Sequence, residues 1–314
     1  MKKLMFCVAV LALLIGCLAG CSPSYQKGDT TVLLTVGGIE VTHEQYRFIC
    51  MKNASILAGE EEDYFTGEDK DAHLKLLEES IEQELRMYYA IETMAEKYDV
   101  SLSDDDKDLL KEEIKGMKEA AESKQAYYEQ FEKAFMSEHV FYLQTKNYYL
   151  ERNLFYHIIE ESNAIVLLSD DQLREDVKKH FFAANQILLQ GEDAEDQAQA
   201  LLERINGGED FTELAKEYSK DNLKDVRYFT TGEMQSYFED TVKELEIGEV
   251  SEPVKSSLGV HLIKREALDM DYVEKNLATF RDTDLVRIYN EMMAKEANSL
   301  KIVYTDAYQG IIWE

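Results

Sequence analysis

The residues whose types suit them for chemistry are concentrated in one stretch, residues 207–264, where they occur in a fixed order of short motifs. Asp221 ends a Tyr-Ser-x-Asp motif, Met234 and Phe238 are four residues apart, and His261 lies in a Gly-x-His-x-Ile motif. Helical or strand periodicity does not by itself produce such ordered motifs. The chemistry they offer is that of a carboxylate, an imidazole and apolar side chains, which act through hydrogen bonds and apolar contact.

The other histidines do not suggest a metal centre. They share no spacing typical of metal ligands, and we interpret each as structural or on the surface: His43, His73, His139, His157 and His180. The acidic runs at residues 60–63 and 104–106 lack the alternating ligands of a calcium-binding loop. We therefore expect no bound metal.

The ordered motifs resemble those of the parvulin-type peptidyl-prolyl isomerase domain. Prolyl isomerisation is rotation about a partial double bond, with a barrier of about 18–20 kcal/mol. A catalyst holds the proline ring in an apolar pocket, excludes water from the amide and stabilises the twisted form. The resemblance implies no covalent intermediate and no cofactor.

The resemblance also implies which residues form the site. It implies a catalytic polar network made of His261, Asp221, Gln186 and Ser256. It implies a substrate pocket made of Met234, Phe238, Val226 and Leu258. Two alternatives stay open at this point. Met234 and Phe238 could belong only to the domain core, and His261 could be a hydrogen-bonded structural histidine.

Two departures from the parvulin pattern bear on activity. The first strand, which in parvulins reads Ser-His-Ile-Leu, here has Asn185 and Gln186 at its start, and glutamine cannot reproduce a pair of imidazoles. The loop over residues 223–227 is short and lacks the glycines usual there, so its backbone has fewer accessible conformations. The level of isomerase activity is therefore left open.

The first 20 residues have the features of a lipoprotein signal peptide. Lys2 and Lys3 precede an apolar stretch over residues 4–15, which is too short to span a bilayer. Residues 18–21, Leu-Ala-Gly-Cys, match a lipobox, and Cys17 ends a looser match. We favour Cys21 as the lipidated residue, which anchors the chain to the membrane by a lipid.

Composition limits the partners. The chain has 34 basic and 63 acidic side chains, a net charge of −29, which repels nucleic acid and anionic lipid headgroups. A hydrophobic content of 45% excludes general disorder. After cleavage and lipidation only Cys50 is left as a thiol, so we expect no disulfide and a buried Cys50.

Periodicity predicts the elements that position the site. A small α+β domain is expected, with strands over 181–189, 226–230 and 259–265 and helices over 194–205, 211–218 and 238–245. Before it, residues 31–55 predict two strands and a helix capped by Thr42 and Gln45, and residues 71–161 have helical periodicity throughout. Ser169 is expected to cap a connecting helix. A final helix over 269–300 and a strand over 300–304 complete the pattern.

One aromatic series in the helical block has two interpretations. It recurs at steps of three and four residues through Tyr128, Phe131, Phe135, His139 and Tyr142. It could be the core of a helical bundle, or a partly exposed wall that contacts unfolded polypeptide. Periodicity does not separate the two.

The opening strands and the parvulin-like stretch together resemble the PrsA and SurA chaperone families. The resemblance predicts a mostly helical chaperone domain with an inserted parvulin-like α+β domain. The expected segments are a signal peptide (1–20), a tether (21–30), an N-terminal helical domain (31–180), the parvulin-like domain (181–268) and a C-terminal segment (269–314). The last segment is expected to return to the helical domain.

The implied function is that of a foldase on the outer face of the cell membrane, in a Gram-positive type of envelope, acting on unfolded or partly folded exported proteins. A non-catalytic holdase with a degenerate parvulin scaffold is the alternative. A solute-binding lipoprotein is disfavoured, because it would need two doubly wound lobes. The sequence leaves open whether the chain forms a homodimer.

Overall fold

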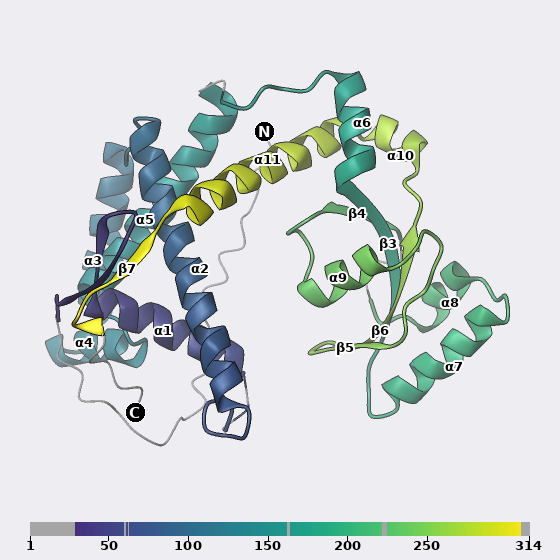
Figure 1. The fold of residues 1–314 in the computed structure, drawn as a ribbon, viewed down its shortest axis with the longest axis horizontal. Helices are drawn as coiled ribbons and strands as arrows, with labels where there is room; N and C mark the ends of the chain where they lie inside the picture. The colour runs from purple at the N-terminus through teal and green to yellow at the C-terminus, as the bar shows by residue number, and fades with distance from the viewer. Residues whose placement is uncertain (1–28, 60, 62, 162–163, 222–224, 309–314) are drawn as a thin grey trace. The chain divides into compact units, whose positions relative to one another are not determined.

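The computed structural model describes residues 29–59, 61, 63–161, 164–221 and 225–308 (Figure 1). The chain divides into two compact units. Of the described residues, unit 1 contains those from 29 to 161 and from 292 to 308, and unit 2 contains those from 164 to 291. The signal peptide, Cys21 and most of the tether lie outside the described residues. None of the helices within the described ranges combines the length and apolar character that a membrane crossing needs.

Unit 1 contains a small antiparallel sheet in the order β2-β1-β7. Its strands are β1 (Val32–Val36), β2 (Ile39–Thr42) and β7 (Ile302–Tyr304). Gly37 and Gly38 form the β1–β2 turn with φ of 60° and 89°, which suits residues without a Cβ. β7 pairs with β1, so strands from opposite ends of the described chain meet in one sheet.

The rest of unit 1 is helical. Its helices are α1 (His43–Ala58), α2 (Lys70–Lys97), α3 (Asp104–Ala120), α4 (Lys124–Lys133), α5 (Glu138–Tyr156) and a π-helical turn (His157–Glu161). The predicted capping is confirmed, since Thr42 N–H donates to Gln45 Oε1 at 3.1 Å. Ser103 likewise accepts from Asp106 N–H at 3.1 Å, which satisfies a free donor of the first turn of α3.

The core of unit 1 lies on the predicted apolar stripe of α2. Its buried members are Leu77, Ile81, Leu85, Tyr88, Tyr89, Ile91 and Met94. Two hydrogen bonds join α2 to α5: Tyr88 Oη donates to Leu143 O at 3.0 Å, and Asn147 Nδ2 donates to Tyr88 O at 3.1 Å. Cys50 is buried with a free thiol, as predicted, and its burial raises the pKa of the thiol to about 12.

The aromatic series does not lie on one helix. The series is interrupted between α4 and α5, where Phe135 adopts a φ of 56° and Ser137 accepts from Val140 N–H at 3.0 Å to begin α5. Phe131 is buried, whereas Tyr142 on the next helix is 41% exposed. A one-turn break leaves the three-and-four spacing of the side chains intact, so periodicity does not reveal it.

Unit 2 is built on an antiparallel sheet in the order β4-β3-β6-β5. The strands are β3 (Phe181–Leu189), β4 (Arg227–Thr230), β5 (Val254–Ser256) and β6 (Gly259–Glu266). The helices are α6 (Asp170–His180), α7 (Ala194–Asn206), α8 (Phe211–Tyr218), α9 (Ser236–Glu244), α10 (Met270–Lys275) and the first part of α11 (Leu277–Ser299). The predicted α+β class, with a mostly helical remainder, is confirmed.

Both faces of the central strands are buried. Ile187 and Leu262 face α7 and α8 in one apolar cluster, and Ala184 and Ile263 face α9 in another. Side chains alternate along a strand, so neighbouring residues belong to opposite faces. Gln186 lies two residues after Ala184, and His261 lies two residues before Ile263. Both side chains are therefore on the face that α9 covers.

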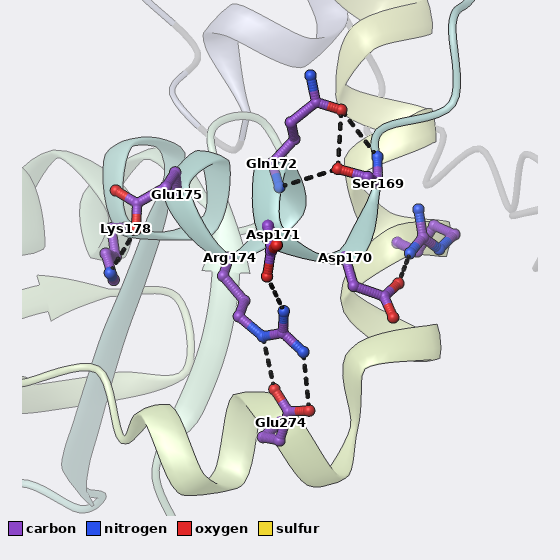
Figure 2. Close-up of polar contacts among 9 residues, drawn as sticks. Ser169, Asp170, Asp171, Gln172, Arg174, Glu175, Lys178 and Glu274 are labelled. Atoms are coloured by element: carbon purple, nitrogen blue, oxygen red, sulfur yellow. Dashed lines mark hydrogen bonds and ion pairs between the residues drawn. The ribbon is translucent and has the colours of Figure 1, made fainter.

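Ion pairs join helix α6 to α10 and α11 within unit 2 (Figure 2). Ser169 caps α6, as predicted, by accepting from Gln172 N–H at 3.4 Å, while its own N–H donates to Gln172 Oε1 at 3.0 Å. Arg174 donates to both carboxylate oxygens of Glu274, at 2.7 and 2.9 Å. Unit 2 therefore includes α6 and α10 in addition to the predicted parvulin-like segment, whose boundaries stay a prediction.

The prediction of one helix over 269–300 is wrong. Asn276 separates α10 from α11 with φ of −118° and ψ of 21°. Its side-chain Nδ2 donates to Tyr272 O at 2.8 Å. An asparagine side chain that bonds to the backbone offers an alternative to the helical pattern, so the helix ends there and restarts.

Candidate functional site

The four residues predicted to form the polar network lie together. Ser256 Oγ is 2.7 Å from His261 Nε2, and His261 Nδ1 is 2.9 Å from Gln186 Oε1. Gln186 Nε2 in turn donates to Asp221 Oδ2. Ser256, His261 and Gln186 come from β5, β6 and β3, whose pairing determines their positions, and Asp221 comes from the loop after α8. Their catalytic roles stay a prediction.

The directions of the hydrogen bonds between Gln186, His261 and Ser256 are set from the Asp221 end of this network, because a serine hydroxyl can accept and donate at the same time. At one end, Leu258 N–H can only donate, and it donates to Ser256 Oγ at 3.0 Å. At the other end, the Asp221 carboxylate accepts from the Gln186 amide. Gln186 therefore presents Oε1 to His261, whose Nδ1 carries the proton. The neutral ring then accepts the Ser256 hydroxyl proton at Nε2.

The imidazole is held in its neutral form. His261 is fully buried, and burial lowers its pKa below the ordinary value of 6.5, because the charged ring would lose its hydration. The Asp221 carboxylate opposes this shift in the pKa, and the Arg227 guanidinium adds to it. His261 is thus a hydrogen-bonding centre of the network near neutral pH rather than a cation.

Asp221 also forms an ion pair with Arg227, the first residue of β4. Both side chains are well covered, with exposed fractions of 13% for Arg227 and 16% for Asp221. The predicted loop departure at residues 223 and 224 lies outside the described residues. Arg227, however, shows what one of the replaced positions does, since its guanidinium contacts the network.

An apolar cluster lies on the same face of the sheet. Phe238 is 2% exposed and packs with Phe229 at a ring distance of 5.7 Å, while Met234 is half-buried at the edge of the cluster. The Tyr237 ring lies 4.8 Å from the His261 ring and so joins the cluster to the polar network. The structure thus gives Phe238 a core position and leaves Met234 more accessible.

The two remaining pocket candidates lie apart from that cluster. Val226 is half-buried just before β4. Leu258 is 56% exposed at the β5–β6 turn, where its backbone N–H joins the network. Their contact with a substrate stays a prediction.

The comparisons with known proteins agree on one family. Residues 178–267 match the family model described as "Rotamase: PPIC-type PPIASE domain". The chain is 31% identical over 242 residues to the foldase protein PrsA of Oceanobacillus iheyensis, which covers 74% of both proteins. The chain belongs to the PrsA foldase family. The predicted recognition of a PrsA-type protein with a parvulin domain is therefore confirmed.

A shorter sequence match names the same family. The foldase protein PrsA of Caldanaerobacter subterraneus is 34% identical over 134 residues, 40% of this chain and 43% of that protein. Among solved structures, the crystal structure of PrsA from Bacillus subtilis is similar at 21% identity, with 86% of this chain and 91% of that chain covered and a TM-score of 0.30. The PrsA assignment rests on the sequence matches.

Two residues that contact the network, Arg227 and Tyr237, were not predicted from the sequence. In the sequence, Arg227 has the features of a loop residue. Its positive charge six residues after Asp221 is the one feature that could have indicated the ion pair. Tyr237 directly precedes Phe238 on α9, whereas Met234 lies before that helix begins, so no helical spacing in the sequence pointed to Tyr237.

Proposed function

We propose that the chain is an extracytoplasmic, membrane-anchored foldase that assists the folding of exported proteins and isomerises their prolyl bonds through unit 2. The observation that carries the proposal is the match to a PrsA foldase over 74% of both proteins. The strongly acidic chain, with a net charge of −29, adds a preference for clients that are not themselves acidic.

The site geometry supports a prolyl isomerase that works without covalent chemistry. Gln186 and His261 at the centre of the network are buried, and the side chains from Ser256 to Asp221 bond to one another, which makes the site rigid. Met234 and Leu258 offer accessible apolar surface beside it. A proline ring held against such surface has a less hydrated amide, which favours the twisted transition state.

One observation favours the alternative of a non-catalytic holdase. Phe238, which the parvulin resemblance assigns to the proline pocket, is 2% exposed and packs with Phe229. A ring in that position gives little surface to a substrate. In the holdase alternative, unit 2 is a scaffold and the helices of unit 1 bind the unfolded client.

Isomerase activity is tested by cis/trans exchange of short X-Pro peptides, measured by NMR with the chain lacking residues 1–21. We expect exchange above the uncatalysed rate, and a fall of roughly 5–100-fold in His261→Ala, because loss of one buried hydrogen-bonding group costs about 1–3 kcal/mol. Met234→Ala should also lower the rate by loss of apolar contact. Absence of acceleration by the folded protein would favour the holdase.

Lipid anchoring is tested by Cys21→Ala in cells that express the full chain. We expect the variant to pass from the membrane fraction to the culture medium, because one lipid-modified cysteine is the proposed anchor. Cys50→Ala is the matched control and should leave the chain on the membrane, since Cys50 is buried. Retention of Cys21→Ala on membranes would contradict the proposed anchor.

A further inference from the structure

We propose that Arg227 is a positioning residue of the site, which holds Asp221 as a fixed acceptor, thereby orients the Gln186 amide, and so determines which ring nitrogen of His261 carries the proton. The inference rests on the proposed function only in placing these residues at the substrate site. The hydrogen-bonding arrangement itself can be tested without a substrate.

The first step is the ion pair. Arg227 Nη2 donates to Asp221 Oδ2, the same oxygen that accepts from Gln186 Nε2. Pairing of β3 with β4 places Arg227 opposite Ala184, two residues before Gln186 on the same strand. Charge-assisted hydrogen bonds in a poorly hydrated environment are strong, so the pair keeps the carboxylate in place.

The second step concerns the shape of the Gln186 side chain. The two ends of an amide have nearly the same shape, and only their hydrogen-bonding partners decide which end points where. A fixed carboxylate at Asp221 requires the NH₂ end and leaves the carbonyl end for His261. An imidazole at position 186 would not have two ends of nearly the same shape. With glutamine at this position, the orientation of the amide depends on the ion pair of Asp221 with Arg227.

The third step is the response of His261. Its Nδ1 can donate to Gln186 Oε1 only while the amide keeps this orientation. If the amide turned round, NH₂ would face the ring, which would then have to accept at Nδ1 and carry its proton at Nε2. Arg227 also lowers the pKa of His261, whereas Asp221 raises it. Loss of Arg227 therefore changes the tautomer and raises the pKa together.

The experiment is ¹⁵N NMR of the histidine ring nitrogens, followed over pH, on the chain lacking residues 1–21. In the unsubstituted chain we expect Nδ1 to carry the proton and His261 to titrate below its ordinary range. In Arg227→Met we expect both ring nitrogens to move toward a mixture of tautomers and the titration to shift to higher pH. An Nδ1–H tautomer and a titration both unchanged in folded Arg227→Met would overturn the proposal.

Further variants separate positioning from a general loss of stability. Arg204→Met removes a guanidinium of the same unit that pairs with exposed Glu209, and it should leave the His261 signals unchanged. In a Gln186→Leu background, Arg227→Met should no longer alter the tautomer, because the link through the amide is absent. An equal change in tautomer with and without Gln186 would show that Arg227 does not act through it.

If Arg227→Met does not fold, Arg227→Gln carries the test. It keeps a hydrogen-bonding side chain but loses the charge, so the same changes in tautomer and titration are expected with a smaller size. Unchanged His261 signals in Arg227→Gln would then overturn the proposal. Tautomer changes in a chain that shows no peptide exchange would support the positioning role and contradict only the isomerase function.

Discussion

Gly259→Ala should strongly destabilise unit 2. Gly259 begins β6 with a φ of 142°, and a Cβ built there would lie 2.1 Å from the backbone oxygen of Leu189 on β3. The backbone strain and the steric overlap each cost about 1–3 kcal/mol, so we expect a total loss of roughly 2–6 kcal/mol. Thermal unfolding should show a Tm for unit 2 lowered by roughly 10 °C or more.

Gly248→Ala is the matched control for this substitution. Gly248 also has a positive φ, of 91°, but a Cβ there would have no atom within 4 Å. The control should therefore lose only the cost of the backbone conformation, roughly 1–2 kcal/mol. Equal losses for the two variants would show that the close approach of β6 to Leu189 does not contribute.

Arg287→Met should be the second strongly destabilising change. Arg287 on α11 is 7% exposed and donates to Asp284 at 2.6 Å and to Asp176 of α6 at 2.7 Å. Its loss leaves buried Asp284, 3% exposed, without its cation. Removing one partner of a buried ion pair costs about 3–5 kcal/mol, which urea unfolding at neutral pH would measure.

The pH dependence gives this prediction a second check. Burial raises the pKa of Asp284 above its ordinary value of 3.8, and neighbouring Asp176 raises it further, against the effect of Arg287. At pH values between the ordinary pKa of 3.8 and the raised pKa of Asp284, the native state binds more protons than the unfolded state. The free energy of unfolding therefore falls as the pH rises through this range. Without Arg287 the pKa of Asp284 rises further. The loss of stability in Arg287→Met, relative to the unsubstituted chain, should therefore become smaller as the pH is lowered.

Arg174→Met is the control for the ion pair. Arg174 joins α6 to Glu274 of α10, but these groups lie at the surface (Figure 2). Exposed ion pairs contribute little because water screens them, so the control should unfold close to the unsubstituted chain. A loss as large as that of Arg287→Met would contradict the distinction between buried and exposed pairs.

Much of unit 2 could be predicted from the sequence, because its elements have clear periodicity and clear ends. β3 and α8 have the predicted bounds, and β6 differs at one end by a single residue. β5 was missed, since a strand of 3 residues is too short to show a period and depends on its pairing with β6. The breaks near Phe135 and at Asn276 were missed because a short interruption preserves helical spacing.

The four residues of the hydrogen-bond network were predictable from the sequence, but their arrangement was not. The motif resemblance named Gln186 and His261, and the pairing of β3 with β6 brings them together. The ion pair of Asp221 with Arg227 depends on the path of a loop, which local patterns do not encode. The depth of Phe238 depends on how α9 packs against the sheet, and its spacing from Met234 fits core and pocket equally.

The pairing of β1 with β7 has a consequence for the order in which the chain acquires its structure. Thr305 Oγ1 donates to Val32 O across 273 residues of sequence, whereas unit 2 is one continuous segment. A chain that emerges from its N-terminus can therefore complete the contiguous unit while β1 still has an unpaired edge. This protein, itself proposed to assist folding, has to keep its own first strand from pairing wrongly until residues 302–304 arrive.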